Sequence, residues 1–328
     1  MARTESLAEL EIDLGTEARE LRFQDPDEPF RILIAGDFSG GVGRNRRPVG
    51  IDRDNFDQVL ALLAPQLRLG AGAAEMAISF RELDDFHPGR LFQRFAGEMR
   101  GLLHHASFQA LESVWRGLYF LTRRVRTGER LKIHLMDLPH ADLVGSGLGD
   151  LGRALDRESW AAIAGLYFFS RDEEETLARI AGMAQDAGAP FIAGIAPEIV
   201  ELTGAFENLR GSLKAQWIGL ALPRFLLRLP YGAFEEMPLP LWGHPALLCA
   251  CLLAEAFERD GWRMRPAGGE IGGLPKPCVE EFLTEDAAAM LLDRGFMPLA
   301  SIQGTDRVRL VRFQSVARPN APLAGKWK

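Results

Sequence analysis

The chain has 328 residues, of which 47% are apolar and 25% charged, a balance typical of a globular protein that buries a sizeable core. The net charge of −7 argues against a protein that binds nucleic acid over a wide surface, since such proteins need an excess of basic groups. Three cysteines are too few for a disulfide framework and fit a reducing compartment, so we expect a cytoplasmic protein.

Residues 1–29 predict a polar N-terminal arm and linker. Their acidic side chains lack the basic-then-apolar order of a signal peptide. Leu10, Ile12 and Leu14 alternate with acidic residues and would share one face of a strand. This pattern fits a strand donated to a neighbouring molecule, but it also fits an edge strand of the chain's own sheet or a disordered tail.

Residues 30–127 predict a first α/β region. Its strands are short, apolar runs, and its helices show apolar residues at core spacing after a capping residue, Asp52 or Asp54 in the first helix. The predicted elements are strands at 31–35 and 77–80, and helices at 56–63, from Pro88, and around 111–121.

Residues 128–315 repeat this alternation, and residues 316–328 form a tail without a regular pattern. The longest apolar run lies between Trp160 and Phe169, about half the length that a membrane span needs, so no membrane insertion is expected. The predicted strands are 131–135, 166–169, 190–195 and 217–222; the predicted helices are 172–187, 245–257 and 285–293; and 268–277 is a predicted loop.

Strands that alternate with helices predict an α/β fold. We expect mainly parallel or mixed sheets flanked by helices, arranged as two linked lobes that correspond to 30–127 and 128–315.

A glycine-rich loop from Gly36 to Gly43 follows the first predicted strand and raises the possibility of a phosphate-binding loop. Such a loop needs a lysine at the position of Val42, and a helix should open directly after it. Neither condition is met, because Val42 is apolar and an arginine-rich stretch intervenes. A nucleotide- or phosphate-binding enzyme is therefore the alternative hypothesis, and a packing loop whose arginines are solvated or meet an acidic partner is the preferred one.

The other polar clusters favour structural roles. Glu82, Asp84, Asp85 and His87 could ligate a divalent metal, but they directly precede a predicted helix, where such groups cap free N–H groups. Cys249 and Cys251 fit small core residues, and the histidines lack the spacing of metal ligands. We therefore expect no catalytic site, no metal and no cofactor.

Several blocks of the sequence resemble the contractile sheath of the bacterial type VI secretion system. FQALESVWRGL (108–118), GLALPRFLLRLPYG (219–232), LWGH (241–244), 268–275, GFMPL (295–299) and GTD (304–306) are similar to the large sheath subunit and follow in its order. PFRILIAGDFSG (29–40), DNFD (54–57) and DDFHP (84–88) are similar to the small subunit. The chain is thus expected to join shortened forms of both subunits.

This resemblance implies a structural protein and not an enzyme. Sheath subunits pack as a helical tube around an inner tube, exchange strands with their neighbours, and are disassembled by a hexameric ATPase. The large subunit continues well beyond the position of Lys328, so a subunit at the sheath end or baseplate is expected as well as one in the sheath wall. Expected partners are copies of the chain, other sheath subunits, the inner tube, the baseplate and that ATPase.

Two sets of residues are the candidate assembly interface. The first is the alternating apolar set Leu10, Ile12 and Leu14, and the second is the basic set Arg44, Arg46 and Arg47. Backbone hydrogen bonds would supply affinity to an exchanged strand, and its alternate side chains would supply specificity.

Overall fold

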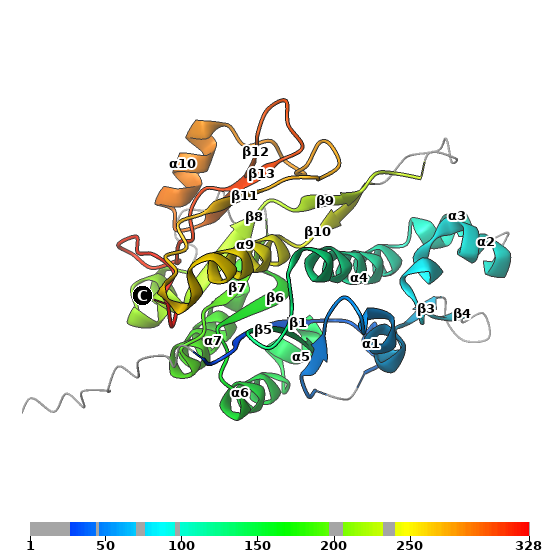
Figure 1. Ribbon diagram of the computed structural model, residues 1–328, viewed down its shortest axis with the longest axis horizontal. Coiled ribbons are helices and arrows are strands. Elements are labelled where there is room, and N and C mark those ends of the chain that lie inside the picture. Colours follow the sequence, from blue (N-terminus) through cyan, green and yellow to red (C-terminus); the bar gives the residue numbers. More distant parts are fainter. Residues whose placement is uncertain are drawn as a thin grey trace, which may run out of the picture.

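The computed structural model describes residues 27–43, 46–69, 76–95, 99–196, 206–231 and 240–327. A nine-stranded sheet forms its centre. Its strands are β1 (Phe30–Gly36), β2 (Val49–Ile51), β5 (Leu131–Asp137), β6 (Ala162–Phe169), β7 (Phe191–Ile195), β8 (Ile218–Leu222), β11 (Gly269–Ile271), β12 (Met297–Ser301) and β13 (Val308–Leu310). They lie in the order β11–β13–β12–β8–β7–β6–β1–β5–β2 (Figure 1).

The middle of this sheet is parallel and its two margins are antiparallel. Every neighbouring pair from β5 to β12 is parallel, whereas β2 at one margin, and β13 and β11 at the other, pair antiparallel. Parallel strands are covered on both faces, which explains why their sequences are continuous apolar runs. The predicted α/β fold with a mainly parallel or mixed sheet is confirmed.

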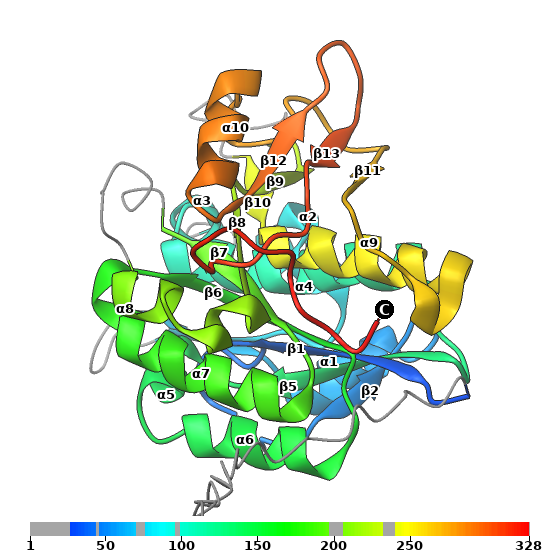
Figure 2. The same cartoon turned by 90° about the vertical axis from the view of Figure 1, so that its left-hand side faces the viewer.

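Helices cover both faces of the sheet, as Figure 2 shows. One face carries α1 (Phe56–Leu63), α4 (Ala106–Arg124) and α9 (Pro245–Asp260). The other face carries α5 (His140–Val144), α6 (Leu148–Arg157), α7 (Glu174–Ala187), α8 (Glu207–Arg210) and α10 (Glu285–Asp293). Outside these layers lie α2 (Pro88–Phe95), α3 (Met99–Leu103), the β3–β4 hairpin (Gln66–Leu69, Met76–Ser79) and the β9–β10 pair (Phe225–Arg228, Leu241–Gly243).

The alternation of side chains along β1 divides the interior into two cores. Ile32 and Ile34 pack into the core under α1, α4 and α9, and Leu33 and Ala35 pack into the core under α6 and α7. All four side chains are fully buried. A single strand thus supports both layers of helices.

The expected division into two lobes does not divide this sheet. β1 and β2 come from residues 30–127, yet β1 lies between β5 and β6, which come from residues 128–315. Strands from both regions therefore share one hydrogen-bonded sheet.

Several predicted elements differ in detail from the structure. The strand expected at 77–80 is β4, which pairs with β3 in a separate hairpin and not with the main sheet. The loop expected at 268–277 contains β11, which pairs with β13. Asn55, and not Asp52 or Asp54, stands at the N-cap of α1; the Asp52 carboxylate instead accepts the backbone N–H groups of Asp54 and Asn55 at 2.8 and 2.9 Å.

The C-terminal tail lies along the part of β8 that β12 leaves uncovered. β12 pairs only with Ala221 and Leu222 of β8. Upstream of these residues, the Val316 N–H donates to the Ile218 carbonyl at 2.9 Å, and the Ala324 N–H donates to the Gln216 carbonyl at 2.8 Å. The tail therefore satisfies backbone groups that a short neighbouring strand would leave without partners.

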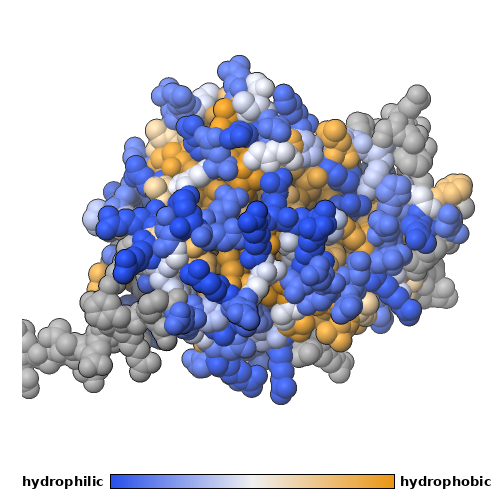
Figure 3. Space-filling model, in the orientation of Figure 1, coloured by the Kyte–Doolittle hydropathy of each residue, from blue (hydrophilic) through white to orange (hydrophobic). Residues whose placement is uncertain are grey.

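Polar and charged residues cover most of the face seen in Figure 3, and apolar surface shows between them near its middle. Within the described ranges, no helix combines the length and the apolar character that crossing a membrane requires.

A close approach at Gly117 sets the packing of α4 on α9. A Cβ atom at Gly117 would lie 2.5 Å from Cδ1 of the fully buried Leu247. We expect Gly117→Leu to lower the free energy of unfolding by about 1–3 kcal/mol, because the extra volume has no space to occupy. Gly149→Leu, at an exposed position of α6, is the matched control and should cost little. Urea unfolding of the two variants tests this, and equal costs would contradict it.

Candidate functional site

The loop from Gly36 to Gly43 uses its own backbone donors. The register of β1 and β5 places Gly36 beside Asp137, whose buried carboxylate accepts the N–H groups of Phe38 and Ser39 at 2.9 and 3.1 Å. Further along, the Gly41 N–H donates to Asp37 at 2.8 Å and the Gly43 N–H donates to the Ser39 hydroxyl at 2.6 Å.

This arrangement does not support the phosphate-binding alternative. The N–H groups that would have to face a phosphate already donate to carboxylates and a hydroxyl, and two carboxylates lie where an anion would bind. Burial, together with the charge of Asp137, raises the pKa of Asp37. Gly43 packs directly over Asp137, since a Cβ there would lie 1.9 Å from Oδ2.

The three arginines of the predicted basic set do not share one environment. Arg44 lies outside the described residues. Arg46 is held inside the molecule: its guanidinium donates to the Asp137 carbonyl at 2.6 Å, lies 3.6 Å from the Asp137 carboxylate and pairs with Asp142. Arg47 lines a hollow of about 460 Å³ against α6 together with Arg153 and Arg157. The apolar set Leu10, Ile12 and Leu14 also lies outside the described residues.

The two longest blocks that resemble the large sheath subunit meet at a buried carboxylate. Glu112 of α4 is fully buried. The guanidinium of Arg228 in β9 donates hydrogen bonds to both carboxylate oxygens, at 2.8 Å from Nε and at 2.6 Å from Nη2. Arg116, one turn along α4, donates to the same carboxylate at 2.7 Å and to the Tyr231 hydroxyl at 2.9 Å. The Arg228 guanidinium also lies 4.2 Å from the centre of the Tyr231 ring.

This network joins block 108–118 to block 219–232, which are separated by about a hundred residues in the sequence. Burial and the negative charge of Glu112 raise the pKa of Tyr231, so the phenol stays protonated. Sequence reasoning recognised both blocks but did not predict the contact between them. The pattern that pointed to it is a charged residue on the apolar face of a predicted helix.

A second buried polar residue, His244, joins a third block to the sheet. Its Nδ1 accepts the Ala246 N–H at the start of α9 at 3.2 Å, so Nε2 carries the hydrogen and donates to the Tyr167 carbonyl of β6 at 3.0 Å. The ring packs on Phe168 with 4.4 Å between centroids. Burial lowers the pKa of His244 to about 3, so the imidazole is neutral in the folded protein.

The acidic cluster before α2 caps backbone groups, but of these residues only His87 caps α2 itself, and Asp85 caps the 3-10 turn Leu83–Phe86 that precedes it. The Asp85 carboxylate accepts the N–H groups of Arg81 and Glu82, and His87 Nδ1 accepts the Gly89 N–H at 3.1 Å. Cys249 and Cys251 are fully buried in α9, which confirms their interpretation as core residues. Among the described residues, no group of three or more His, Cys, Asp or Glu side chains is placed to hold a metal ion.

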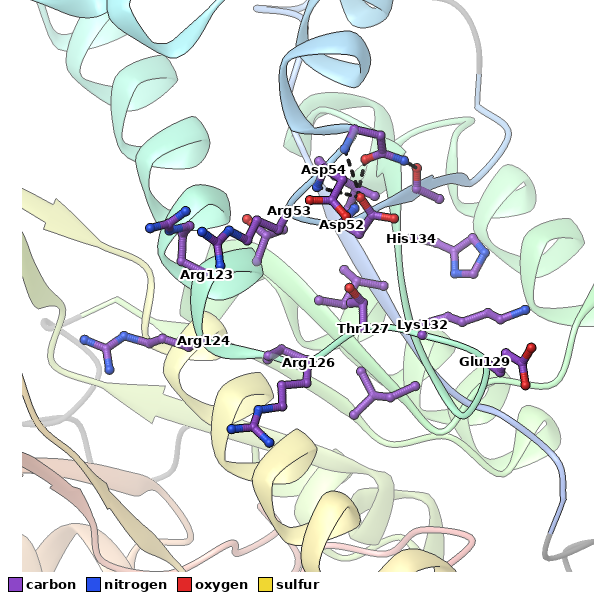
Figure 4. Close-up of a pocket in the computed structure, with 18 residues that line it drawn as sticks. Asp52, Arg53, Asp54, Arg123, Arg124, Arg126, Thr127, Glu129, Lys132 and His134 are labelled. Atoms are coloured by element: carbon purple, nitrogen blue, oxygen red, sulfur yellow. Dashed lines mark hydrogen bonds between the residues drawn. The ribbon is translucent and has the colours of Figure 1, made fainter.

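A basic groove that the sequence reasoning missed lies between the end of α4, the β2 margin of the sheet and the start of β5 (Figure 4). Its volume is about 1090 Å³. Its charged lining comprises Arg53, Arg123, Arg124, Arg126, Lys132, Asp52, Asp54 and Glu129. The run Arg123-Arg124-Val125-Arg126 at the end of a predicted helix was the available signal, but only the fold brings Arg53 and Lys132 beside it.

Fold and site together define a mixed α/β protein in which the sheath-like blocks build the core and hold one another in place. Comparison with known proteins agrees with this class. Residues 24–114 match the type VI secretion system family VipA, and residues 91–154 match the tail sheath N-terminal domain of the family VipB (EvpB). The resemblance to both sheath subunits is therefore confirmed.

Among curated proteins, the chain is similar to the type VI secretion system sheath protein TssC1 of Pseudomonas aeruginosa. The two are 28% identical over 297 residues, which cover 69% of this chain and 60% of TssC1. The chain thus spans less than two thirds of the length of this relative.

Two solved structures resemble the chain at 14% identity. One is the contracted helical sheath of the anti-feeding prophage, with a TM-score of 0.46, covering 87% of this chain and 64% of that one. The other is the baseplate of the same prophage, with a TM-score of 0.45, covering 88% and 62% respectively.

The buried ion pair of Glu112 and Arg228 should contribute far more to the free energy of unfolding than an exposed ion pair does. We expect Arg228→Met to lower the free energy of unfolding by about 3 kcal/mol, because it leaves a buried carboxylate short of its bidentate partner. Arg224→Met is the matched control: it breaks the more exposed pair with Glu280 and should cost less than about 1 kcal/mol. If the two variants lose similar amounts of unfolding free energy in urea titrations, the buried network is not important for stability.

His244 should make stability depend on pH. Its pKa is lowered from 6.5 to about 3 in the folded state, so the unfolded chain binds a proton that the folded chain excludes. The contribution of His244 to the free energy of unfolding is complete above pH 6.5. As the pH falls from 6.5 toward 3, the free energy of unfolding decreases by about 1.4 kcal/mol per pH unit.

Unfolding free energies at pH 7, 6 and 5 test this expectation. His244→Asn should be less stable at pH 7 but should lose stability less steeply on acidification. His104→Asn, at an exposed position, should keep the slope of the unaltered protein. Parallel slopes for all three proteins would exclude this role of His244.

Proposed function

We propose that the chain is a structural, sheath-like subunit of a type VI secretion apparatus or a related contractile injection device. It acts by assembly with other subunits around an inner tube, or at the sheath end or baseplate. The observation that carries this proposal is the presence of a VipA match and a VipB match in one chain, which overlap over residues 91–114.

The internal geometry supports a structural role. The blocks most similar to sheath subunits contribute Glu112, Arg228 and His244, and these side chains are used for internal cohesion. The glycine-rich loop was the strongest candidate for a ligand site in the sequence. Its backbone N–H groups instead donate hydrogen bonds to carboxylates of the same chain. We therefore infer a protein without catalytic activity or a cofactor.

Assembly surfaces and partners form part of the same proposal. Leu10, Ile12 and Leu14 are the proposed donated segment, and Arg44 and Arg47 are proposed to contribute to a basic contact; Arg46 supports that loop through Asp137 and Asp142. The proposed partners are further copies, other sheath subunits, the inner tube, the baseplate and a sheath-disassembling ATPase, all in the cytoplasm.

Electron microscopy and analytical ultracentrifugation of the purified chain test the proposal. We expect higher-order assemblies of the chain alone, or on addition of purified sheath subunits. Replacing Leu10, Ile12 and Leu14 together by Asp should reduce association at least tenfold, whereas Leu213→Asp, at a residue that is 80% exposed, should not. A strictly monomeric chain that binds no sheath, tube or baseplate component would contradict the proposal.

A further inference from the structure

The basic groove between α4, β2 and β5 is a hollow with many charged side chains in its lining. Five cationic side chains and three carboxylates line it, in a chain whose net charge is −7. In Figure 4, Arg123, Arg124 and Arg126 lie on one side and Lys132 on the other. A surplus of positive charge in a hollow attracts an acidic group.

The cations of the groove outnumber its carboxylates by two. No described carboxylate pairs with Arg53, Arg126 or Lys132, whereas Asp52 already accepts two backbone N–H groups. Arg123 lies over the ring of Tyr119. Arg124 lies over the ring of Phe120, and its charge also acts on the carboxylate of Glu255 in α9.

The N-terminal sequence carries the complementary charge. Between Glu5 and Asp13 there are four carboxylates, Glu5, Glu9, Glu11 and Asp13, and no basic residue.

The start of the described chain lies close to the groove. Phe30 pairs with Leu131, which lines the groove, and the Phe30 N–H donates to the Arg130 carbonyl at 2.7 Å. β1 is two strands from β2, a separation of about 10 Å. The fourteen residue-to-residue steps from Asp13 to Asp27 can span up to about 46 Å, which is ample for the chain to return to its own groove.

We propose that the acidic segment 5–13 of the chain binds in the basic groove of the same molecule. A tethered segment acts at an effective concentration in the millimolar range, which favours the molecule's own groove over that of a second copy in dilute solution. The contact covers the margin of the sheet next to the short edge strand β2, which an unassembled subunit would otherwise expose. It concerns the unassembled chain and does not depend on the proposed function.

Zero-length carbodiimide cross-linking tests the contact, because it joins a carboxylate only to an amine in direct contact. Lys132 is the one lysine that lines the groove, and exposed Lys214 is the control amine. In the dilute full-length protein, mass spectrometry should find segment 5–13 joined to Lys132 at least fivefold more often than to Lys214. The yield should fall between 50 and 500 mM salt, about the range over which exposed charges become screened.

Charge reversal provides the matched variants. Arg53→Glu with Arg126→Glu should reduce the cross-link to Lys132 at least fivefold. Arg171→Glu with Arg179→Glu makes the same change of net charge at exposed positions outside the groove and should leave the yield unchanged. Unchanged thermal unfolding of both variants will show that they fold.

A mixture of unlabelled and ¹⁵N-labelled chains identifies the molecule that supplies the segment. Cross-linked peptides that are wholly light or wholly heavy support binding within one chain. Mixed peptides at about half of the signal would show that a second copy fills the groove and would overturn the proposal. A cross-link to Lys132 no more frequent than that to Lys214 would overturn it as well.

Discussion

The carboxylate of Glu112 is the constraint on which the packing of α4 depends. A charge that is fully buried is stable only when its oxygens are paired and hydrogen-bonded, and here Arg228 and Arg116 supply the partners. Since Arg228 belongs to β9, the Glu112 carboxylate has its bidentate partner only when β9 lies beside α4. The close approach at Gly117 then brings α9 against the same helix. These two contacts hold residues that are far apart in the sequence in one core.

The same logic explains the glycine-rich loop. Parallel pairing of β1 with β5 brings Asp137 to the point where the loop leaves the sheet. Its Oδ1 accepts the N–H groups of Phe38 and Ser39, whereas Oδ2 accepts no hydrogen bond within the described residues and faces the Arg46 guanidinium at 3.6 Å. The glycines therefore allow the backbone to wrap around an internal carboxylate. An α/β fold with a glycine-rich loop after its first strand does not by itself imply nucleotide binding.

The two family matches meet within a single folding unit. The VipA-like segment supplies β1, and the VipB-like segment supplies β5, its parallel neighbour. A continuous sheet with shared cores leaves little freedom between the two segments. The resemblance to TssC1 extends this relationship over 69% of the chain.

The amino-acid sequence by itself determined the elements and their class. The predicted strand 166–169, which is the second half of β6 (Ala162–Phe169), and the predicted helix 172–187, which contains α7, follow from local patterns, and the family blocks are contiguous. Only the tertiary structure decided that β1 lies between β5 and β6, that Glu112 meets Arg228, and that Arg53 and Lys132 share a groove with Arg126. Strand order and ion pairing join residues about a hundred positions apart, and such contacts depend on how the layers pack, which local patterns do not record.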